Sequence, residues 1–344
     1  MRDRILKLCP ESREEILAKT EILSVGVDTS IFTSVEKFSR NTTIKNIFDK
    51  GPFDGKPPEL LNALYAQLDK GQWETITTFR KSYQNKFPDK NITDQLKKIP
   101  WENGKILLFV GALTVGKGIQ TLIVSLPFIL RRHPETHLVV VGNGAYREVL
   151  EALVYAISKK DNKLLDYLIQ NGYDLDQNEF SGSWEDVQYF ISKSNMRDEL
   201  FTYGVNLQSQ VHFLGRLDHD LLRFVFPCAD FALFPSIIPE AYQLVITESL
   251  SNGVFPLASY FSGSADSIDS VIPFLGQKMV DRMKISVDVK KRIPGLITNL
   301  SDLLTDESIN KSKSDFRKVV VENFDWKIVA KKMVAAYSKF LFGI

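Results

Sequence analysis

Residues 231–259 read FALFPSIIPEAYQLVITESLSNGVFPLAS and contain a complete strand, helix and strand pattern. The apolar run at 231–234 predicts a buried strand, residues 244–251 predict an amphipathic helix, and residues 255–258 predict a second buried strand. Short apolar runs on both sides of a helix are typical of a parallel βαβ unit. The stretch therefore predicts an α/β fold.

The same alternation extends toward the N-terminus. The expected elements are, in order, a strand at residues 106–110, a helix at 116–130, a strand at 138–141, a helix at 146–156, a strand at 211–214 and a helix at 218–226. At least five strands separated by helices predict a doubly wound α/β fold with a parallel, Rossmann-like sheet. In such a sheet, ligands bind where the carboxyl ends of the strands enter loops and helices.

Several regions fall outside this alternation. Residues 40–101 are polar and helix-like, so we expect an elaboration rather than a part of the core. Residues from about 157 to 210 lose the alternation, which predicts an insertion with its own helices. The tail at 325–342 has the pattern of an amphipathic helix. The first 20 residues predict a short amphipathic helix, and residues 22–25 a strand.

Composition restricts the class of protein. The chain has 344 residues, 44% of them hydrophobic, which is enough to bury a sizeable core. Its net charge of +1 gives no overall field that favours nucleic acid or an anionic membrane. Cys9 and Cys228 lack metal-ligand spacing, and the apolar surroundings of Cys228 predict a buried free thiol in a reducing, cytoplasmic compartment. No signal-peptide core and no apolar run of roughly 18 residues is found, so no transmembrane segment is expected.

Two glycine-rich loops follow expected strands. Residues 111–118 read GALTVGKG and place Lys117 at the start of a helix, where a phosphate can bind. The loop is not a Walker A motif, because Gly118 follows the lysine, and an ordinary loop with a surface lysine explains it equally well. Residues 142–144 read GNG, which is typical of a tight turn and only weak evidence for a ligand.

A pair of carboxylates lies in the stretch quoted first. We expect a helix to open at Ala241, so that Glu240 and Glu248 are separated by eight residues, a rise of about 12 Å. That length is comparable to the reach of a nucleotide sugar from hexose to ribose. Two carboxylates so placed can accept hydroxyl hydrogen bonds at both ends of a ligand whose diphosphate faces the helix N-terminus. The alternative is that both glutamates are ordinary helix charges.

Residues 235–268, PSIIPEAYQLVITESLSNGVFPLASYFSGSADSI, resemble the signature of glycosyltransferase family 4, also called glycosyl transferases group 1. Further resemblances follow in chain order: GVDTSIF to the family's interdomain linker, KILLFVGALTVGKGIQTLI to its phosphate loop, VHFLGRLDH and CADFALFPS to its nucleobase-side segments, and NFDWKIVAKKMVAAY to its closing helix. The resemblance covers about residues 23–266 and the closing helix. It implies the C-terminal, nucleotide-sugar-binding domain of a two-domain GT-B glycosyltransferase.

The resemblance implies a role for each matching position. Lys117 and Glu240 would be the catalytic residues, the lysine pairing with the leaving diphosphate and the glutamate facing the sugar hydroxyls. Glu248 would hold the ribose hydroxyls. The donor-binding set would be Gly111, Gly144, Gly215, Arg216, Leu217, Ala241, Tyr242, Gln243, Leu244, Glu248, Ser262 and Gly263. His219 lies just past Gly215, Arg216 and Leu217, where it could reach a ligand, although it also suits an ordinary helix start.

This sequence departs from the family pattern at two positions that matter for binding. Ala112 stands where the family usually has a second basic residue, a loss worth about 2 to 4 kcal/mol in the transition state. Gln243 replaces a glycine and crowds the backbone that would approach the donor. The sequence also begins only about 20 residues before the linker, so we expect the N-terminal GT-B domain to be absent.

These resemblances divide the chain into expected units. They are an edge remnant of the N-terminal domain at 1–24, a linker with helical elaboration at 25–100, the donor-binding domain at 101–320 with the insertion at about 157–210, and a crossing helix at 321–344. With the N-terminal domain absent, the first and last helices would expose apolar faces meant for it.

The leading hypothesis is a cytoplasmic, retaining hexosyltransferase that binds a nucleoside-diphosphate sugar, needs no cofactor and no bound metal, and works with a separate N-terminal domain or subunit. A second hypothesis is a catalytically inactive nucleotide-sugar-binding or regulatory subunit of a split glycosyltransferase, favoured by Ala112 and Gln243. A third, a Rossmann dehydrogenase, rests on the GNG turn alone and lacks the full dinucleotide fingerprint.

Overall fold

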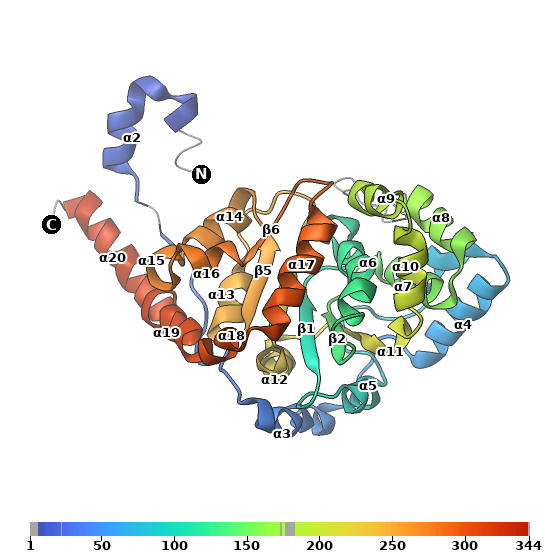
Figure 1. Ribbon diagram of the computed structural model, residues 1–344. Coiled ribbons are helices and arrows are strands. Elements are labelled where there is room, and N and C mark those ends of the chain that lie inside the picture. Colours follow the sequence, from blue (N-terminus) through green and yellow to red (C-terminus); the bar gives the residue numbers. More distant parts are fainter. Residues whose placement is uncertain (1–5, 22, 173, 176–182, 343–344) are drawn as a thin grey trace.

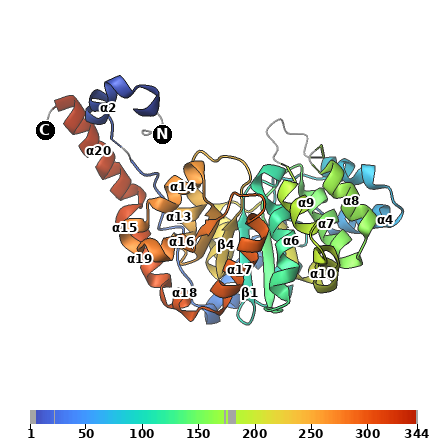
Figure 2. The same ribbon diagram turned by 45° about the horizontal axis from the view of Figure 1, so that its top comes forward.

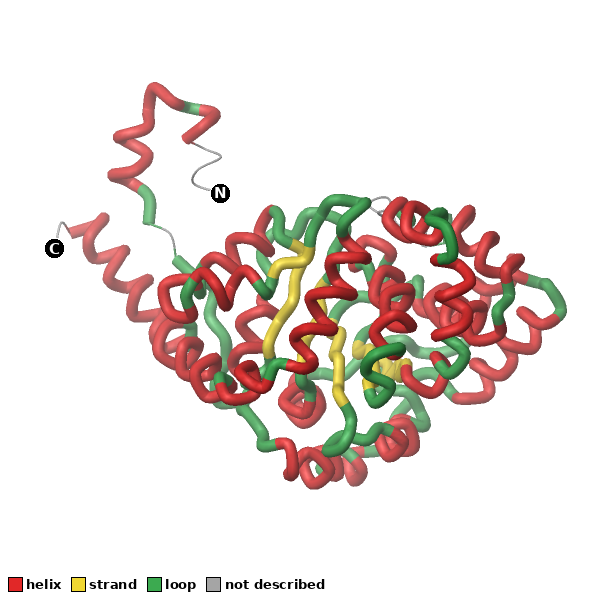
Figure 3. The backbone as a smooth tube through the Cα atoms, in the orientation of Figure 1, coloured by secondary structure: helices red, strands yellow, loops and turns green. Residues whose placement is uncertain are grey.

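The computed structural model describes residues 6–21, 23–172, 174–175 and 183–342. Its centre is a six-stranded parallel sheet with the strand order β3-β2-β1-β4-β5-β6 (Figures 1 and 3). The strands are β1 (Lys105–Val110), β2 (Thr136–Val141), β3 (Val211–Gly215), β4 (Phe231–Phe234), β5 (Phe255–Ser259) and β6 (Lys284–Ile285). The predicted doubly wound, Rossmann-like sheet is therefore confirmed.

The strand order reverses between β1 and β4. From β1 the chain proceeds outward through β2 to β3, returns to β4 beside β1, and then proceeds to β5 and β6 on the other side. Such a reversal leaves a crevice at the carboxyl ends of the two central strands, because the connecting helices depart in opposite directions. The loops after Val110 and Phe234 therefore face each other across this crevice.

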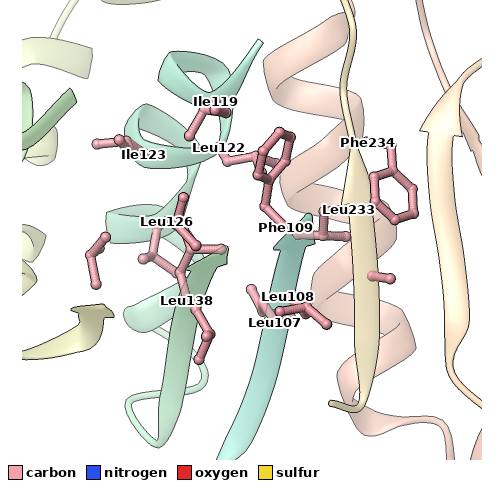
Figure 4. Close-up of a cluster of buried hydrophobic side chains, with 14 of the residues drawn as sticks. Leu107, Leu108, Phe109, Ile119, Leu122, Ile123, Leu126, Leu138, Leu233 and Phe234 are labelled. Atoms are coloured by element: carbon pink, nitrogen blue, oxygen red, sulfur yellow. The ribbon is translucent and has the colours of Figure 1, made fainter. Parts of the chain in front are cut away.

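The core is formed by the central strands and helix α6 (Ile119–Leu130) (Figure 4). Leu108 and Leu233 are buried on neighbouring strands, and Ile123 is buried on the helix. Helix α6 is apolar on nearly all sides because it packs against α17 (Arg292–Thr305) as well as the insertion helices. Fully apolar strands and helices of this kind are what a sheet covered on both faces requires.

The segment expected to lie outside the core belongs to it. Residues 40–101 form α3 (Arg40–Lys45), α4 (Pro58–Asp69), the 3-10 helix η4 (Trp73–Lys81) and α5 (Ile92–Lys98). Their apolar side chains join the same buried cluster as the sheet; among them are Ile44, Leu64, Ile76, Leu96 and Trp101. The expectation that this segment lies outside the core was wrong, because α4 and η4 pack on α7 (Arg147–Lys159) and α5 packs on the edge strand β3.

A buried network of charges fastens this segment to α7. Arg147 donates to both carboxylate oxygens of Asp89 at 2.6 Å, and its Nε donates to Glu151 at 3.0 Å. Lys56 donates to Glu148 at 3.0 Å and also to Glu151. All five side chains are nearly inaccessible to solvent. Burial alone would lower the pKa of Arg147, but the carboxylates of Asp89 and Glu151 raise it well above its ordinary value.

The region expected to be an insertion contains helices of its own. They are α8 (Asn162–Asn171), α9 (Glu185–Ile191), α10 (Met196–Tyr203) and α11 (Leu207–Gln210). Helix α10 packs on α6, and α9 packs on both α6 and α17. Cys228, in the turn before β4, is a free and buried thiol as predicted, and burial raises its pKa to about 12.

The two ends of the chain extend from the body on the same side (Figures 1 and 2). Helix α2 (Arg13–Lys19) and helix α20 (Trp326–Phe342) lie away from the sheet. The strand expected at 22–25 is not formed at residues 23–25, and a single parallel bridge joins Val27 to Asp325 instead. Large apolar side chains of these helices are exposed, namely Leu17, Trp326, Met333, Val334, Tyr337, Phe340 and Leu341. No described helix is long and apolar enough to cross a membrane.

Candidate functional site

A pocket of about 420 Å³ opens in the crevice between β1 and β4. Its walls come from the ends of both strands, from the loops that follow them, and from the first turns of α12 (His219–Val225) and α13 (Leu244–Ser251). The lining residues are Phe109, Val110, Gly111, Ala112, Lys117, Leu217, His219, Leu222, Phe234, Ser236, Glu240, Tyr242, Gln243, Leu244, Val245 and Glu248.

Lys117 is the cation of this pocket, since no other Lys or Arg is among its described lining residues. It ends the 3-10 helix η5 (Val115–Lys117), and Gly118 follows with a left-handed φ of 72°. A Cβ on Gly118 would lie 2.1 Å from the carbonyl oxygen of Pro235, so the two loops pack backbone to backbone. This close approach brings Lys117 Nζ to 2.6 Å from Glu240 Oε1.

Glu240 is held by two donors on one carboxylate oxygen. Ser236 Oγ donates to the same Oε1 at 2.6 Å, and Gln243 Nε2 donates to Ser236 Oγ at 3.2 Å. A hydrogen-bonded chain thus joins Lys117, Glu240, Ser236 and Gln243 across the pocket. Because both donors use Oε1, the other carboxylate oxygen remains available to accept from a ligand.

The backbone around Glu240 differs from the expectation. Helix α13 begins at Leu244 and not at Ala241, so Glu240 lies in a loop, and the helical rise of about 12 Å does not describe its separation from Glu248. The loop rests on Gly263, whose N–H donates to the Glu240 carbonyl at 2.9 Å. A Cβ on Gly263 would lie 1.9 Å from the Ala241 carbonyl oxygen. Glycine at this position therefore sets where the Glu240 loop lies.

Glu248 and His219 form the other end of the pocket. Burial raises the pKa of Glu248, and the nearby His219 opposes the rise. The His219 ring meets Phe32 edge-on, with the ring centroids 5.2 Å apart. His219 is thus both the first residue of α12 and a wall of the pocket. This end combines apolar side chains with one carboxylate, a chemistry suited to a nucleoside.

Neutralising Glu248 should stabilise the chain. Because the folded-state pKa of Glu248 is raised, the folded chain binds this proton more tightly than the unfolded chain. The stabilisation that comes from protonating Glu248 is therefore fully present below its unfolded-state pKa and is lost as pH rises through its raised folded-state pKa. We expect Glu248→Gln to raise the melting temperature at pH 7 by about 2 °C, as a gain of about 1 kcal/mol would do. At pH 4 the gain should shrink. Calorimetric melting at both pH values checks this, and an equal gain at both would contradict it.

The structure gathers some of the sequence-predicted residues at the pocket and leaves others outside its lining. The lining includes Gly111, Lys117, Leu217, Glu240, Tyr242, Gln243, Leu244 and Glu248. The predicted residues outside it are Gly144, Gly215, Arg216, Ala241, Ser262 and Gly263. Each of the first two glycines packs against backbone: a Cβ on Gly144 would lie 2.1 Å from the Leu113 carbonyl oxygen, and a Cβ on Gly215 would meet residues 87 and 89.

Sequence reasoning gave no role to Ser236. It directly follows the proline after β4, and its hydroxyl is the link between Glu240 and Gln243. The signal was present in the family-like PS pair, but a serine in a loop has many ordinary explanations. Within the described residues, no group of three or more His, Cys, Asp or Glu side chains is arranged to hold a metal ion.

Comparison with known proteins supports the family resemblance. Residues 91–166, which contain β1, the Lys117 loop, α6 and β2, match the sequence model of the family described as glycosyl transferases group 1. The chain is also similar in sequence to known glycosyltransferases. It is 26% identical over 239 residues to an uncharacterized glycosyltransferase of Methanocaldococcus jannaschii, covering 69% of this chain and 45% of that protein.

Two further proteins are similar to this chain. The phosphatidylinositol N-acetylglucosaminyltransferase gpi3 subunit of Schizosaccharomyces pombe is 22% identical over 67% of this chain and 37% of its own length. Sucrose-phosphate synthase from Thermosynechococcus elongatus has the same fold with a TM-score of 0.50 and 18% identity, covering 94% of this chain and 53% of that one. The chain thus spans about half, or less, of the length of these proteins.

Proposed function

We propose that this chain is a group 1 glycosyltransferase domain that binds a nucleoside-diphosphate sugar in the pocket between β1 and β4 and transfers its hexose to an acceptor with retention of configuration. The observation that carries this proposal is the Lys117 to Glu240 contact of 2.6 Å at the rim of the sheet, next to the first turn of α13. A cation, a carboxylate and free helix amides at one place match a diphosphate joined to a polyol.

The diphosphate would lie between Lys117 and the N-terminus of α13. The first turn of a helix leaves backbone N–H groups without intrahelical partners, and Leu244 and Val245 of that turn line the pocket. An ammonium carries three donors, so Lys117 can keep its bond to Glu240 while it donates to a phosphate. The lysine would thus stabilise the charge that develops as the diphosphate leaves.

The carboxylates would bind the two polyol ends of the donor. Glu240 would accept from hydroxyls of the hexose through its second oxygen, and Glu248 would accept from the ribose hydroxyls. In the transfer, the bond from the anomeric carbon to the diphosphate oxygen breaks, and a bond from the acceptor hydroxyl oxygen forms on the same face. The hydroxyl proton leaves with the nucleoside diphosphate. We propose that no metal takes part, with Lys117 supplying the positive charge.

The acceptor side would come from an N-terminal glycosyltransferase domain, either a separate chain or a further part of a longer protein. The exposed apolar side chains of α20, such as Val334, Tyr337 and Leu341, give such a domain a surface to cover. The helix carries four lysines and no acidic residue, so a complementary surface would be acidic. We place the assembled enzyme in the cytosol.

The second candidate function is a nucleotide-sugar-binding or regulatory subunit without catalysis. Ala112 favours it, because the pocket has one cation where two would neutralise a diphosphate more fully. An activity assay distinguishes the enzyme from the subunit. The chain is co-expressed with an N-terminal domain, and the nucleoside diphosphate set free from the sugar donor is measured. Turnover by the wild-type chain or by Ala112→Lys supports the enzyme, and binding without turnover in both supports the subunit.

Calorimetry with UDP, GDP, ADP and NAD tests the binding proposal. We expect one of the three nucleoside diphosphates to bind at micromolar to millimolar concentration and NAD to bind more weakly. If none of the three binds at millimolar concentration, the proposed function is wrong. If NAD alone binds, the pocket is a dinucleotide site like that of a dehydrogenase, and the proposed function is wrong.

Adding the second cation should strengthen binding. Ala112 lines the pocket beside Gly111, so a lysine there can reach the diphosphate. We expect Ala112→Lys to lower the dissociation constant of the bound nucleoside diphosphate about 10-fold, the effect of one charge-assisted hydrogen bond. Ala112→Met, of similar reach but uncharged, is the matched control and should bring no gain. Equal affinities of the two variants would show that position 112 does not face the diphosphate.

A further inference from the structure

Gln243 has a buried polar atom without a partner among the residues that the structure describes. The side chain is 6% exposed, and its Nε2 donates to Ser236 Oγ at 3.2 Å. Its carboxamide oxygen, Oε1, accepts no hydrogen bond from any described residue. An unsatisfied carbonyl oxygen of this kind destabilises the folded state. Such groups are rare in folded proteins and call for an explanation.

The residue that carries this oxygen lies at the pocket. Gln243 is one of the lining residues, and it immediately precedes the first turn of α13. The hydrogen-bonded chain through Ser236 ties the carboxamide to Glu240, which we have placed against the hexose. The amide orientation is fixed by this chain: Ser236 gives its proton to Glu240, so it can only accept from Gln243, and Nε2 must face it.

Taken together, these contacts assign a role to the remaining oxygen. We propose that Gln243 determines donor specificity, its carboxamide oxygen accepting a hydrogen bond from a hydroxyl or an amide N–H of the donor sugar. This inference rests on the proposed function, since it takes the hexose to lie beside Glu240. The ligand class is a nucleoside-diphosphate sugar that carries a hydrogen-bond donor at the ring position facing Gln243. A sugar without a donor at that position leaves the oxygen unsatisfied and binds more weakly.

A competing role for Gln243 makes the opposite prediction. If the side chain only obstructs the approach of the donor to α13, removing its amide should strengthen binding of the sugar nucleotide. If it serves the sugar, removing the amide should weaken binding of the sugar nucleotide and spare the nucleoside diphosphate. The two roles therefore predict opposite changes in the ratio between the dissociation constants of the sugar nucleotide and the nucleoside diphosphate.

The test compares each nucleoside diphosphate with its sugar conjugate on the full chain. Dissociation constants are measured by calorimetry for UDP and UDP-glucose, GDP and GDP-mannose, and ADP and ADP-glucose. In Gln243→Leu, which removes the amide and keeps the size, we expect the sugar conjugate to bind about 10-fold more weakly. The nucleoside diphosphate alone should change less than about twofold. Gln188→Leu, on the solvent-exposed face of α9, is the matched control and should change neither.

Substrate analogues identify the contact independently of how well a variant folds. With the wild-type chain, replacing one sugar hydroxyl at a time by fluorine, which cannot donate, should weaken binding about 10-fold at each position whose hydroxyl donates to Glu240 or to Gln243. In Gln243→Leu, or in Gln243→Met if the leucine variant melts early, the penalty at one of these positions should vanish and the others should remain. If every penalty persists in the variant, the inference is overturned, because other residues then accept from all of these hydroxyls.

Two other results overturn the inference. One is an unchanged ratio between the dissociation constants of conjugate and diphosphate in Gln243→Leu, whether both affinities stay the same or both fall equally. The other is tighter binding of the conjugate. In each case a nucleoside diphosphate still binds and the proposed function stands. Failure of all three nucleoside diphosphates to bind the wild-type chain would instead remove the proposed function, and this inference with it.

Discussion

Replacing Lys117 by alanine should raise the dissociation constant for the bound nucleoside diphosphate by about 10- to 100-fold, the loss of one charge-assisted hydrogen bond worth about 1.5 to 3 kcal/mol. The lysine is the only Lys or Arg among the described lining residues, so no neighbour replaces it. Its removal also leaves the Glu240 carboxylate without its cation, which adds repulsion toward the diphosphate. Calorimetry with UDP, GDP or ADP measures the change.

A lysine elsewhere on the surface provides the control. Lys97 Nζ lies 3.7 Å from Asp94 Oδ1, and both side chains are more than half exposed. We therefore expect Lys97→Ala to change the affinity for the nucleoside diphosphate by less than about twofold. A change of less than twofold in Lys117→Ala as well would contradict a diphosphate at this position. It would also remove the basis for calling Lys117 catalytic.

Arg147→Ala should lower the free energy of unfolding by about 3 to 5 kcal/mol, the typical cost of removing one partner from a buried ion pair. Asp89 would lose both donors from the guanidinium, and Glu151 would lose one, while both carboxylates remain buried. Because this network joins residues 56–89 to α7, the loss should loosen that segment first. Urea unfolding at pH 7, followed by circular dichroism, measures the change.

The same substitution on the surface should have little effect. Arg197 is paired with Asp166 at 2.6 Å, but the two side chains are 32% and 48% exposed. We expect Arg197→Ala to cost less than about 1 kcal/mol. If Arg147→Ala cost no more than Arg197→Ala, the buried network would not be what fastens the segment to the domain.

Periodicity predicted the sheet because each central strand is buried on both faces. The runs predicted at β1, β2, β4 and β5 are continuously apolar, β4 begins and ends at the residues expected, and α13 ends at the residue expected. Strand β6 has only two residues, Lys284 and Ile285, and a pair is too short to show a period. The sequence pattern indicated the helices of residues 40–101 but not their burial in the core. Arg40, for example, is a charged residue in a polar segment, yet it is fully buried because it pairs with Asp230, which lies 190 positions away in the sequence.

The candidate site was predictable in its loops and not in its side-chain pairings. Motif resemblance placed Lys117, Glu240 and Glu248, which come together because the strand order reverses between β1 and β4. The direct contact of Lys117 with Glu240 depends on Gly118 packing against Pro235, a close approach that no local pattern discloses. His219 was recognised as the start of a helix, and the structure adds that it lines the pocket. Gly144 was assigned to the donor, whereas its backbone contact with Leu113 explains it as a turn.

A crystal structure of the chain with its nucleoside diphosphate would test the central claim most directly. We predict the diphosphate within hydrogen-bonding distance of Lys117 Nζ and the backbone amides of Leu244 and Val245, with the ribose hydroxyls at Glu248. A diphosphate bound elsewhere, for example at the GNG turn or beside Arg147, with the pocket between β1 and β4 empty, would contradict it.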